Sequence, residues 1–167
     1  MTELTSADVP PVGPEDHVRG EGPEAIVYLD LACPHCAAVW GRVRDLELRL
    51  VLRHFPMAAK HPRAPALHAA AEAAGRQGRF WEMCDSLLTD RAHQDDPHLW
   101  ERARRFELDL DRFERERRSE EVSARVRRDF EGGIRAGVAS TPAAFVGGRR
   151  VEGEIDRALA SLTSGAI

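Results

Sequence analysis

The stretch "LDLACPHCAAVW" (residues 29–40) places Cys33 and Cys36 directly after an apolar run and at the start of a helix-like one. Upstream, "AIVYLDL" (25–31) is rich in β-branched and aromatic residues and lies between turn signals, which predicts a buried strand. Pro34 occupies the first position of the helix that follows, where a proline is tolerated because that N–H has no helical partner. The stretch therefore predicts two cysteines at the carboxyl end of a strand.

The residues that follow complete a strand–helix–strand unit. Apolar side chains recur at helical spacing from Cys36 to Val43. The segment "LELRLVLRHF" (46–55) then alternates apolar and polar residues, as a half-buried strand does. A short edge strand is expected at "HVRG" (17–20).

The remainder of the chain divides into a helical block and a second group of strands. Residues 62–137 read as helical throughout, and Val122, Val126, Phe130 and Ile134 predict a buried stripe on the last helix. After this block, 143–147 predicts a strand, Gly147-Gly148 a hairpin turn, 149–152 a short strand and 154–163 a closing helix. Strands thus flank the helices on both sides.

Composition narrows the class of protein. The 167 residues fit one domain, and the net charge of −4 gives no general attraction to nucleic acid or to anionic membranes. No stretch has the apolar length of a transmembrane helix. The first 20 residues hold acids and prolines but no apolar core of a secretory signal, so we expect a cytoplasmic protein with a mobile arm at residues 1–14.

Three kinds of chemistry use a pair of cysteines at this spacing. A structural zinc site needs four ligands, but Cys84 is expected on a buried helical face and the histidines show no HxxxH spacing, so we expect no metal. A disulfide with a purely structural role would stabilise the fold little, because closing so short a loop removes little entropy from the unfolded chain. Thiol–disulfide exchange fits better.

The two cysteines are expected to have different roles in such an exchange. Cys33, at the helix start, faces free amide N–H groups and the positive end of the helix dipole, which favour a thiolate nucleophile. Cys36, one turn inside, is shielded and resolves the mixed disulfide. His35 adds a donor and positive charge beside Cys33, which favours the reduced form and makes the disulfide more oxidising.

The motif "CPHC" on a strand-to-helix turn, followed far downstream by "STPAAF" (140–145), resembles the thioredoxin superfamily and its DsbA-like branch. The likeness spans roughly residues 16–160. It implies an α/β, thioredoxin-like fold with a central mixed sheet and an inserted all-helical subdomain. The thioredoxin-like domain would comprise 15–61 and 138–167, and the helical insertion 62–137.

The resemblance also assigns further residues. Cys33 and Cys36 match the attacking and resolving cysteines, with Pro34 and His35 between them. Thr141-Pro142 matches the cis-proline loop, whose exposed main-chain groups can pair with a substrate strand.

One position departs from the family. Many members have a buried acid six residues before the first cysteine, and here that residue is Val27. Asp30 matches another acid of this branch and is the possible proton acceptor for Cys36.

The function expected from these residues is thiol–disulfide exchange with protein cysteines, without a cofactor. The redox partner is unknown, with thioredoxin-linked or glutathione-linked partners open, and no nucleic acid or membrane is expected as a partner. The direction stays open, because "CPHC" favours an oxidant and a cytoplasmic address favours reduction. The alternatives are a redox-inactive or regulatory peptide-binding module and a glutathione-dependent transferase or isomerase of small molecules. Intact Cys33 and Cys36 argue against both.

Overall fold

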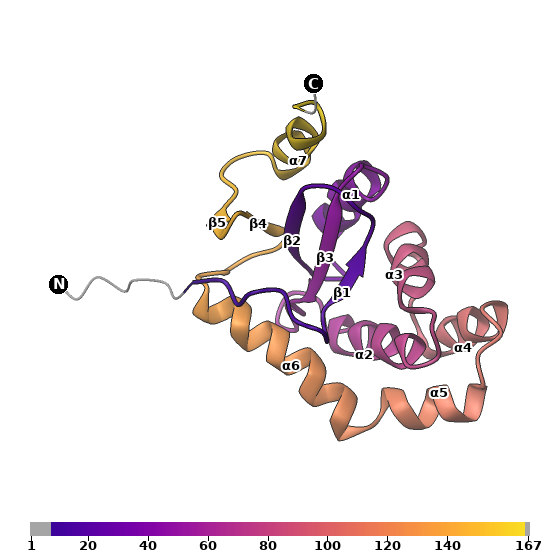
Figure 1. The fold of residues 1–167 in the computed structure, drawn as a ribbon. Coiled ribbons are helices and arrows are strands. Elements are labelled where there is room, and N and C mark those ends of the chain that lie inside the picture. The colour runs from indigo at the N-terminus through magenta and orange to yellow at the C-terminus, as the bar shows by residue number, and fades with distance from the viewer. Residues whose placement is uncertain (1–7, 166–167) are drawn as a thin grey trace.

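A mixed five-stranded sheet forms the centre of the computed structural model, which describes residues 8–165 (Figure 1). The strand order is β1–β3–β2–β4–β5. Strands β2 and β3 are parallel, and the other neighbouring pairs are antiparallel. Because β2 is the middle strand, the segment that leaves its carboxyl end starts inside the molecule. The strands are β1 (His17–Arg19), β2 (Glu24–Leu29), β3 (Arg49–His54), β4 (Ala143–Val146) and β5 (Arg149–Arg150).

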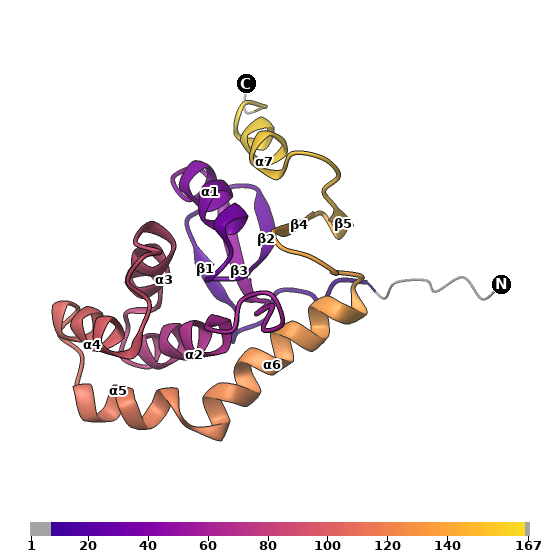
Figure 2. The same cartoon turned by 180° about the vertical axis from the view of Figure 1, so that it is seen from behind.

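Seven helices accompany the sheet within the described residues. Helix α1 joins the parallel strands β2 and β3, a connection that parallel strands need, and α2–α6 lie between β3 and β4 in the chain. Both views place α1 and α7 together at one end of the molecule and α5 and α6 at the other (Figures 1 and 2). The helices are α1 (Pro34–Val43), α2 (Ala64–Gly75), α3 (Phe80–Thr89), α4 (Asp96–Arg105), α5 (Leu110–Arg117), α6 (Glu120–Arg135) and α7 (Ile155–Thr163).

The helical block predicted at 62–137 consists of five separate helices with local start signals. The side chains of Asp95, Asp109 and Ser119 each accept a hydrogen bond from the N–H three residues on, which caps α4, α5 and α6. The division of the chain into a thioredoxin-like domain and a helical insertion stays a prediction. Within residues 8–165, no helix combines the length and the apolar run needed to cross a bilayer.

The two faces of the sheet carry separate hydrophobic clusters. Along β2, Val27 and Leu29 belong to the cluster that contains the buried residues of α1 and both Cys33 and Cys36. Ile26 and Tyr28 point to the opposite face, where they pack with Phe55 and part of α6. This alternation follows from the two-residue period of a strand.

Helix α6 packs on the sheet through a different face from the predicted one. Val122 and Val126 are buried, but Ile134 is 51% exposed, so the prediction of burial is wrong for Ile134. A four-residue step advances about 400° around a helix, so each repeat drifts by about 40° and the stripe leaves the buried face. Gly133 faces the sheet instead. A Cβ atom there would lie 2.9 Å from ring atoms of both Phe55 and Tyr28.

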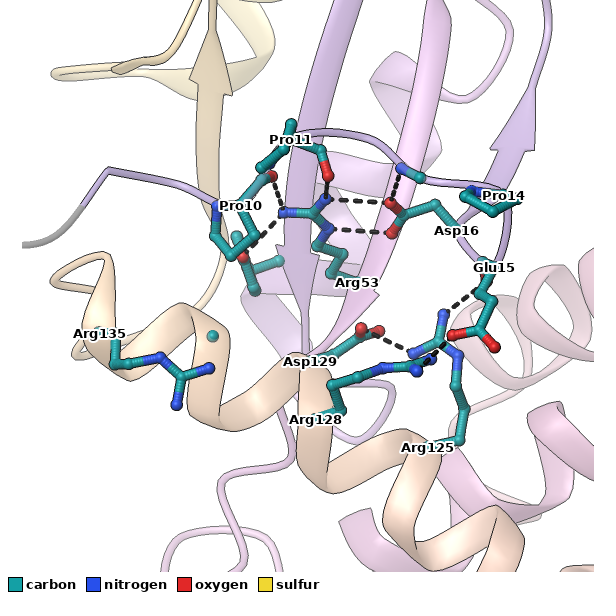
Figure 3. A pocket seen from close by; sticks show the side chains of 13 residues that line it. Pro10, Pro11, Pro14, Glu15, Asp16, Arg53, Arg125, Arg128, Asp129 and Arg135 are labelled. Carbon is teal, nitrogen blue, oxygen red and sulfur yellow. Dashed lines mark hydrogen bonds and ion pairs between the residues drawn. The ribbon is translucent and has the colours of Figure 1, made fainter.

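The described part of the predicted mobile arm, residues 8–14, is held against the sheet and α6, while residues 1–7 lie outside the described residues. The buried guanidinium of Arg53 donates to the carbonyls of Pro10 and Pro11 and forms a two-point ion pair with Asp16. These contacts border a cavity of about 480 Å³ that neither Cys33 nor Cys36 lines (Figure 3). Burying a charge this deeply requires such partners, which explains why the segment is anchored.

Candidate active site

The two cysteines lie where the sequence predicts them, between the end of β2 and the first turn of α1. Cys33 is the N-cap of α1: its backbone is extended, and its Sγ atom accepts a hydrogen bond from the Cys36 N–H at 3.5 Å. Sulfur thus takes the place that a serine or aspartate oxygen has at other helix starts. Both are free thiols, Cys33 with 7% exposure and Cys36 with none. Cys33 is therefore the cysteine nearer to solvent.

Strand pairing brings the Thr141–Pro142 loop to these cysteines. Strand β4 runs antiparallel to β2 with Ala143 opposite Tyr28, so the loop before β4 meets the chain that leaves β2. The Cys33 thiol donates to the Thr141 carbonyl at 3.9 Å, and the Thr141–Pro142 peptide bond is cis. A backbone carbonyl from a segment more than 100 residues away thus faces Cys33.

Pro34 and His35 are exposed at the first turn of α1. Pro34 stands in the first turn, as the sequence predicts. His35 is open to a molecule that approaches Cys33, and its effect on the redox balance stays a prediction.

Asp30 contacts Cys36 through its main chain and other groups through its side chain. The Asp30 N–H donates to Cys36 Sγ at 3.4 Å. The carboxylate, which is fully buried, accepts from the N–H groups of Ala32 at 2.9 Å and Met57 at 3.0 Å. Burial by itself would raise the pKa of Asp30, but these N–H donors, and the His68 ring whenever its Nε2 carries a proton, outweigh it and hold the pKa below its usual value. Asp30 is therefore a buried carboxylate at neutral pH.

Cys36 lies in apolar surroundings. Val27, which stands at the position of the family's acid, belongs to the same hydrophobic cluster as Cys36. Burial is the main cause that raises the pKa of the Cys36 thiol far above its usual range. The fully buried Cys84 on α3 also has its pKa raised by burial, which suits an inert core thiol.

A buried polar cluster that the sequence did not predict lies next to Asp30. His68 and Glu72 lie on one face of α2, and His54 ends β3. The His54 side chain is hydrogen-bonded to both His68 and Glu72, and His17 of β1 contacts Glu72. The four-residue spacing of His68 and Glu72 was the one local signal, but only the packing of α2 against β1 and β3 shows their partners.

Comparisons with known proteins agree with this geometry. A family model described as thioredoxin matches residues 14–161. The chain is 41% identical over 165 residues to the "Na(+)/H(+) antiporter NhaA 1" of Salinispora arenicola and 42% identical over 155 residues to the "Na(+)/H(+) antiporter NhaA 3" of Salinispora tropica. These matches cover 92% and 86% of this chain but 25% and 23% of the relatives, so the chain spans about a quarter of their length.

Solved structures show the same fold. A thioredoxin-like oxidoreductase from Silicibacter pomeroyi has a TM-score of 0.79 at 24% identity, with 91% of this chain and 92% of that chain covered. The thiol-disulfide exchange protein alpha-DsbA2 from Wolbachia pipientis has a TM-score of 0.78 at 15% identity, with 90% of this chain and 87% of that chain covered. The thiol-disulfide oxidoreductase MdbA from Corynebacterium diphtheriae has a TM-score of 0.70 at 17% identity, with 87% of this chain and 85% of that chain covered. The predicted thioredoxin-like fold is confirmed.

Proposed function

The chain belongs to the thioredoxin family, and we propose that it is a thiol–disulfide oxidoreductase that exchanges disulfides with protein cysteines. Cys33 is the nucleophile and Cys36 the resolving thiol. The observation that supports this most directly is the asymmetry of the pair. Cys33 Sγ caps the amino end of α1 beside a backbone carbonyl, while Cys36 is fully buried behind it.

The exchange proceeds in two steps that balance in electrons. The Cys33 thiolate attacks a substrate disulfide, so a bond forms between Cys33 and one substrate sulfur while the other leaves as a thiolate. Cys36 then attacks Cys33 Sγ, the Cys33–Cys36 disulfide forms, and the second substrate thiolate is released. Two electrons pass to the substrate, and the reverse sequence oxidises a substrate dithiol.

The Thr141–Pro142 loop supports a role in substrate binding. Its carbonyl at Thr141 is already directed at Cys33 Sγ, and main-chain groups at such a position can pair with an extended substrate segment. His35 and Pro34 are exposed on the same turn and would meet that segment first.

Trapping tests the proposal. Cys36→Ser removes the resolving thiol, so a mixed disulfide on Cys33 accumulates and its partner is identified by mass spectrometry. Cys33→Ser, which keeps one cysteine of the pair, is the matched control and traps nothing. If Cys36→Ser collects no thiol partner, the proposal is wrong.

The redox equilibrium with glutathione gives the direction of the reaction. A reduction potential near that of thioredoxin, about −270 mV, contradicts the strong oxidant that "CPHC" favours. The cytoplasmic location stays a prediction.

The curated relatives support a second candidate function. Their printed names describe Na⁺/H⁺ antiporters, and this chain matches about a quarter of each. We propose as the alternative that this domain acts on, or regulates, a membrane antiporter. A domain tethered to its target has a high effective concentration, so even a weak contact is productive. An antiporter among the proteins trapped by Cys36→Ser favours this function, whereas antiporter activity that does not change with Cys33→Ser contradicts a redox form of it.

A further inference from the structure

A row of closely spaced polar side chains leads from Asp30 to the protein surface, and it is hydrogen-bonded from His68 onward. His68 Nε2 lies 3.5 Å from Asp30 Oδ1, and His68 Nδ1 lies 2.7 Å from His54 Nδ1. His54 Nε2 lies 2.6 Å from Glu72 Oε1, which is also 2.5 Å from His17 Nε2. His54 and His68 are fully buried, and the His17 side chain is 19% exposed. These residues come from three elements, β1, β3 and α2, and from the segment that follows β2.

One main-chain contact is the basis for assigning the ring protons. The Leu31 N–H donates to His68 Nε2 at 3.0 Å, so we assign the proton of the neutral His68 ring to Nδ1, which then donates to His54 Nδ1. His54 therefore carries its proton on Nε2 and donates it to Glu72. Burial lowers the pKa of His68 to about 4, which agrees with a neutral ring.

The same residues have the composition of a metal site, but their geometry is that of hydrogen bonds. His17, His54 and Glu72 supply the two nitrogens and one carboxylate of a familiar zinc site. Ligands about 2.1 Å from a zinc ion lie more than about 3 Å apart, whereas both nitrogens are within 2.6 Å of Glu72 Oε1. His54 Nε2 also holds a proton where an ion would bind. The cluster is therefore arranged to share protons.

The proposed function requires a proton to move at this place, and the inference rests on that function. Reduced Cys36 is a thiol because its burial disfavours the thiolate, and Cys36 in the disulfide carries no proton. One proton must therefore enter or leave a fully buried site in each exchange. Val27 supplies no acid to receive it.

We propose that His68, His54, Glu72 and His17 form a proton relay between the Asp30–Cys36 site and solvent. As Cys36 attacks Cys33, its proton passes to the Asp30 carboxylate and the substrate thiolate leaves. Asp30 gives a proton to His68 Nε2, His68 gives its Nδ1 proton to His54 Nδ1, and His54 gives its Nε2 proton to Glu72. Glu72 passes one proton out by way of His17, so one proton leaves for each one accepted. The reverse sequence delivers a proton to Cys36.

Other charged groups face the relay from the elements packed against it. Asp129 on α6 accepts the His54 main-chain N–H at 3.1 Å and is paired with Arg125 at 2.7 Å. Cys84 on α3 lies within the electrostatic reach of Glu72. The ring of Phe80 stacks on His17 with 3.4 Å between centroids and limits its exposure. The acid–base groups that link Asp30 to the surface are thus the three histidines and Glu72.

The relay residues act on Cys36 only through Asp30. Their test therefore measures the attack of Cys36 on the mixed disulfide separately from the formation of that disulfide on Cys33. The full chain in its reduced form is mixed with excess oxidised glutathione at pH 5–9, quenched with acid and examined by mass spectrometry. The Cys36→Ser background gives the rate at which the glutathione adduct forms on Cys33. The decay of the adduct in proteins that retain Cys36 gives the rate of resolution, in H₂O and in D₂O.

We expect His54→Gln to slow resolution at pH 7 about tenfold, less than the ~10²–10⁴-fold typical of a group in direct contact, and to leave adduct formation unchanged. His17→Gln, at the partly exposed end of the relay, slows resolution several-fold and remains informative if His54→Gln does not fold. Both change the pH profile and enlarge the solvent isotope effect. Phe113→Leu, a buried change on α5, is the control for lost stability. It should leave the rate of resolution, its pH profile and the solvent isotope effect unchanged.

Two negative results have different meanings. If Cys36→Ser forms no adduct on Cys33, the proposed function is wrong and the relay with it. If adducts form normally but both histidine variants resolve them at the wild-type rate with the wild-type pH profile, the relay alone is wrong.

Discussion

The N–H of Asp30 donates to Cys36 Sγ over 3.4 Å, while the Asp30 carboxylate points to other partners. Asp30 thus contacts the Cys36 thiol through its main chain, and its side chain lies beside the buried His68 ring. The proton acceptor expected from the sequence is therefore part of a larger buried network.

Replacing Asp30 with asparagine should destabilise the fold. The asparagine amide places an NH₂ group where the carboxylate accepts from the N–H of Ala32 or Met57, and an unsatisfied buried donor costs about 1–3 kcal/mol. Since the pKa of Asp30 is lower in the folded chain, its contribution is present above pH 3.8 and is lost as the pH falls through the folded pKa. Urea unfolding at pH 7 and pH 3 measures both effects. Asp8→Asn, at an exposed position, should leave stability at pH 7 unchanged.

His68 should make stability depend on pH between about 4 and 6.5. Its pKa is lowered to about 4 in the folded chain from 6.5, so the unfolded chain takes up the proton more readily in this window. Stability is complete above pH 6.5 and falls by up to about 3 kcal/mol as the pH approaches 4. In His68→Gln that part of the pH dependence disappears, which urea titrations at pH 7.5 and 4.5 would show. An equally steep loss in the variant would contradict this assignment.

Gly133→Ala should destabilise the contact between α6 and the sheet. The added methyl group would lie 2.9 Å from the rings of Phe55 and Tyr28, and such overpacking costs about 1–3 kcal/mol. Gly132→Ala is the matched control, because its Cβ would meet a Pro10 side-chain atom at an ordinary 3.4 Å. The midpoint of thermal unfolding should be lower for Gly133→Ala but not for Gly132→Ala. Equal midpoints for the two variants would contradict the prediction.

Arg53→Met should release residues 8–14. The guanidinium joins this segment to β3, and removing one partner of a buried ion pair typically costs about 3–5 kcal/mol. Limited proteolysis should then cut this segment faster. Arg49→Met removes an exposed ion pair with Glu24 from the same strand and should not change the cleavage rate.

His35→Ala should make the disulfide less oxidising. The ring is exposed at the first turn of α1, and we expect it to offer Cys33 a donor and, when protonated, a positive charge. Its loss should shift the equilibrium with glutathione toward the disulfide by about tenfold, or about 30 mV for this two-electron couple. An unchanged equilibrium would assign His35 to substrate contact alone.

Local patterns predicted much of the fold and the centre of the site. The proline after Cys33, the apolar spacing up to Val43 and the Gly147-Gly148 turn each indicate structure within a few residues, and helix α1 and the hairpin are where they predict them. The stripe on α6 was less reliable, because an i+4 repeat does not follow one helix face for long and Ile134 leaves the core.

By itself the sequence determined that Cys33 starts helix α1 and that Cys36 lies one turn inside it, because the start of a helix depends on neighbouring residues in the chain. Only the tertiary structure decided which groups surround that pair. The register of β4 on β2 brings Thr141 to Cys33, and the packing of α2 against β3 joins His68 to His54. These contacts span 108 and 14 residues of chain, and their distances depend on strand register and packing, which a local spacing does not encode.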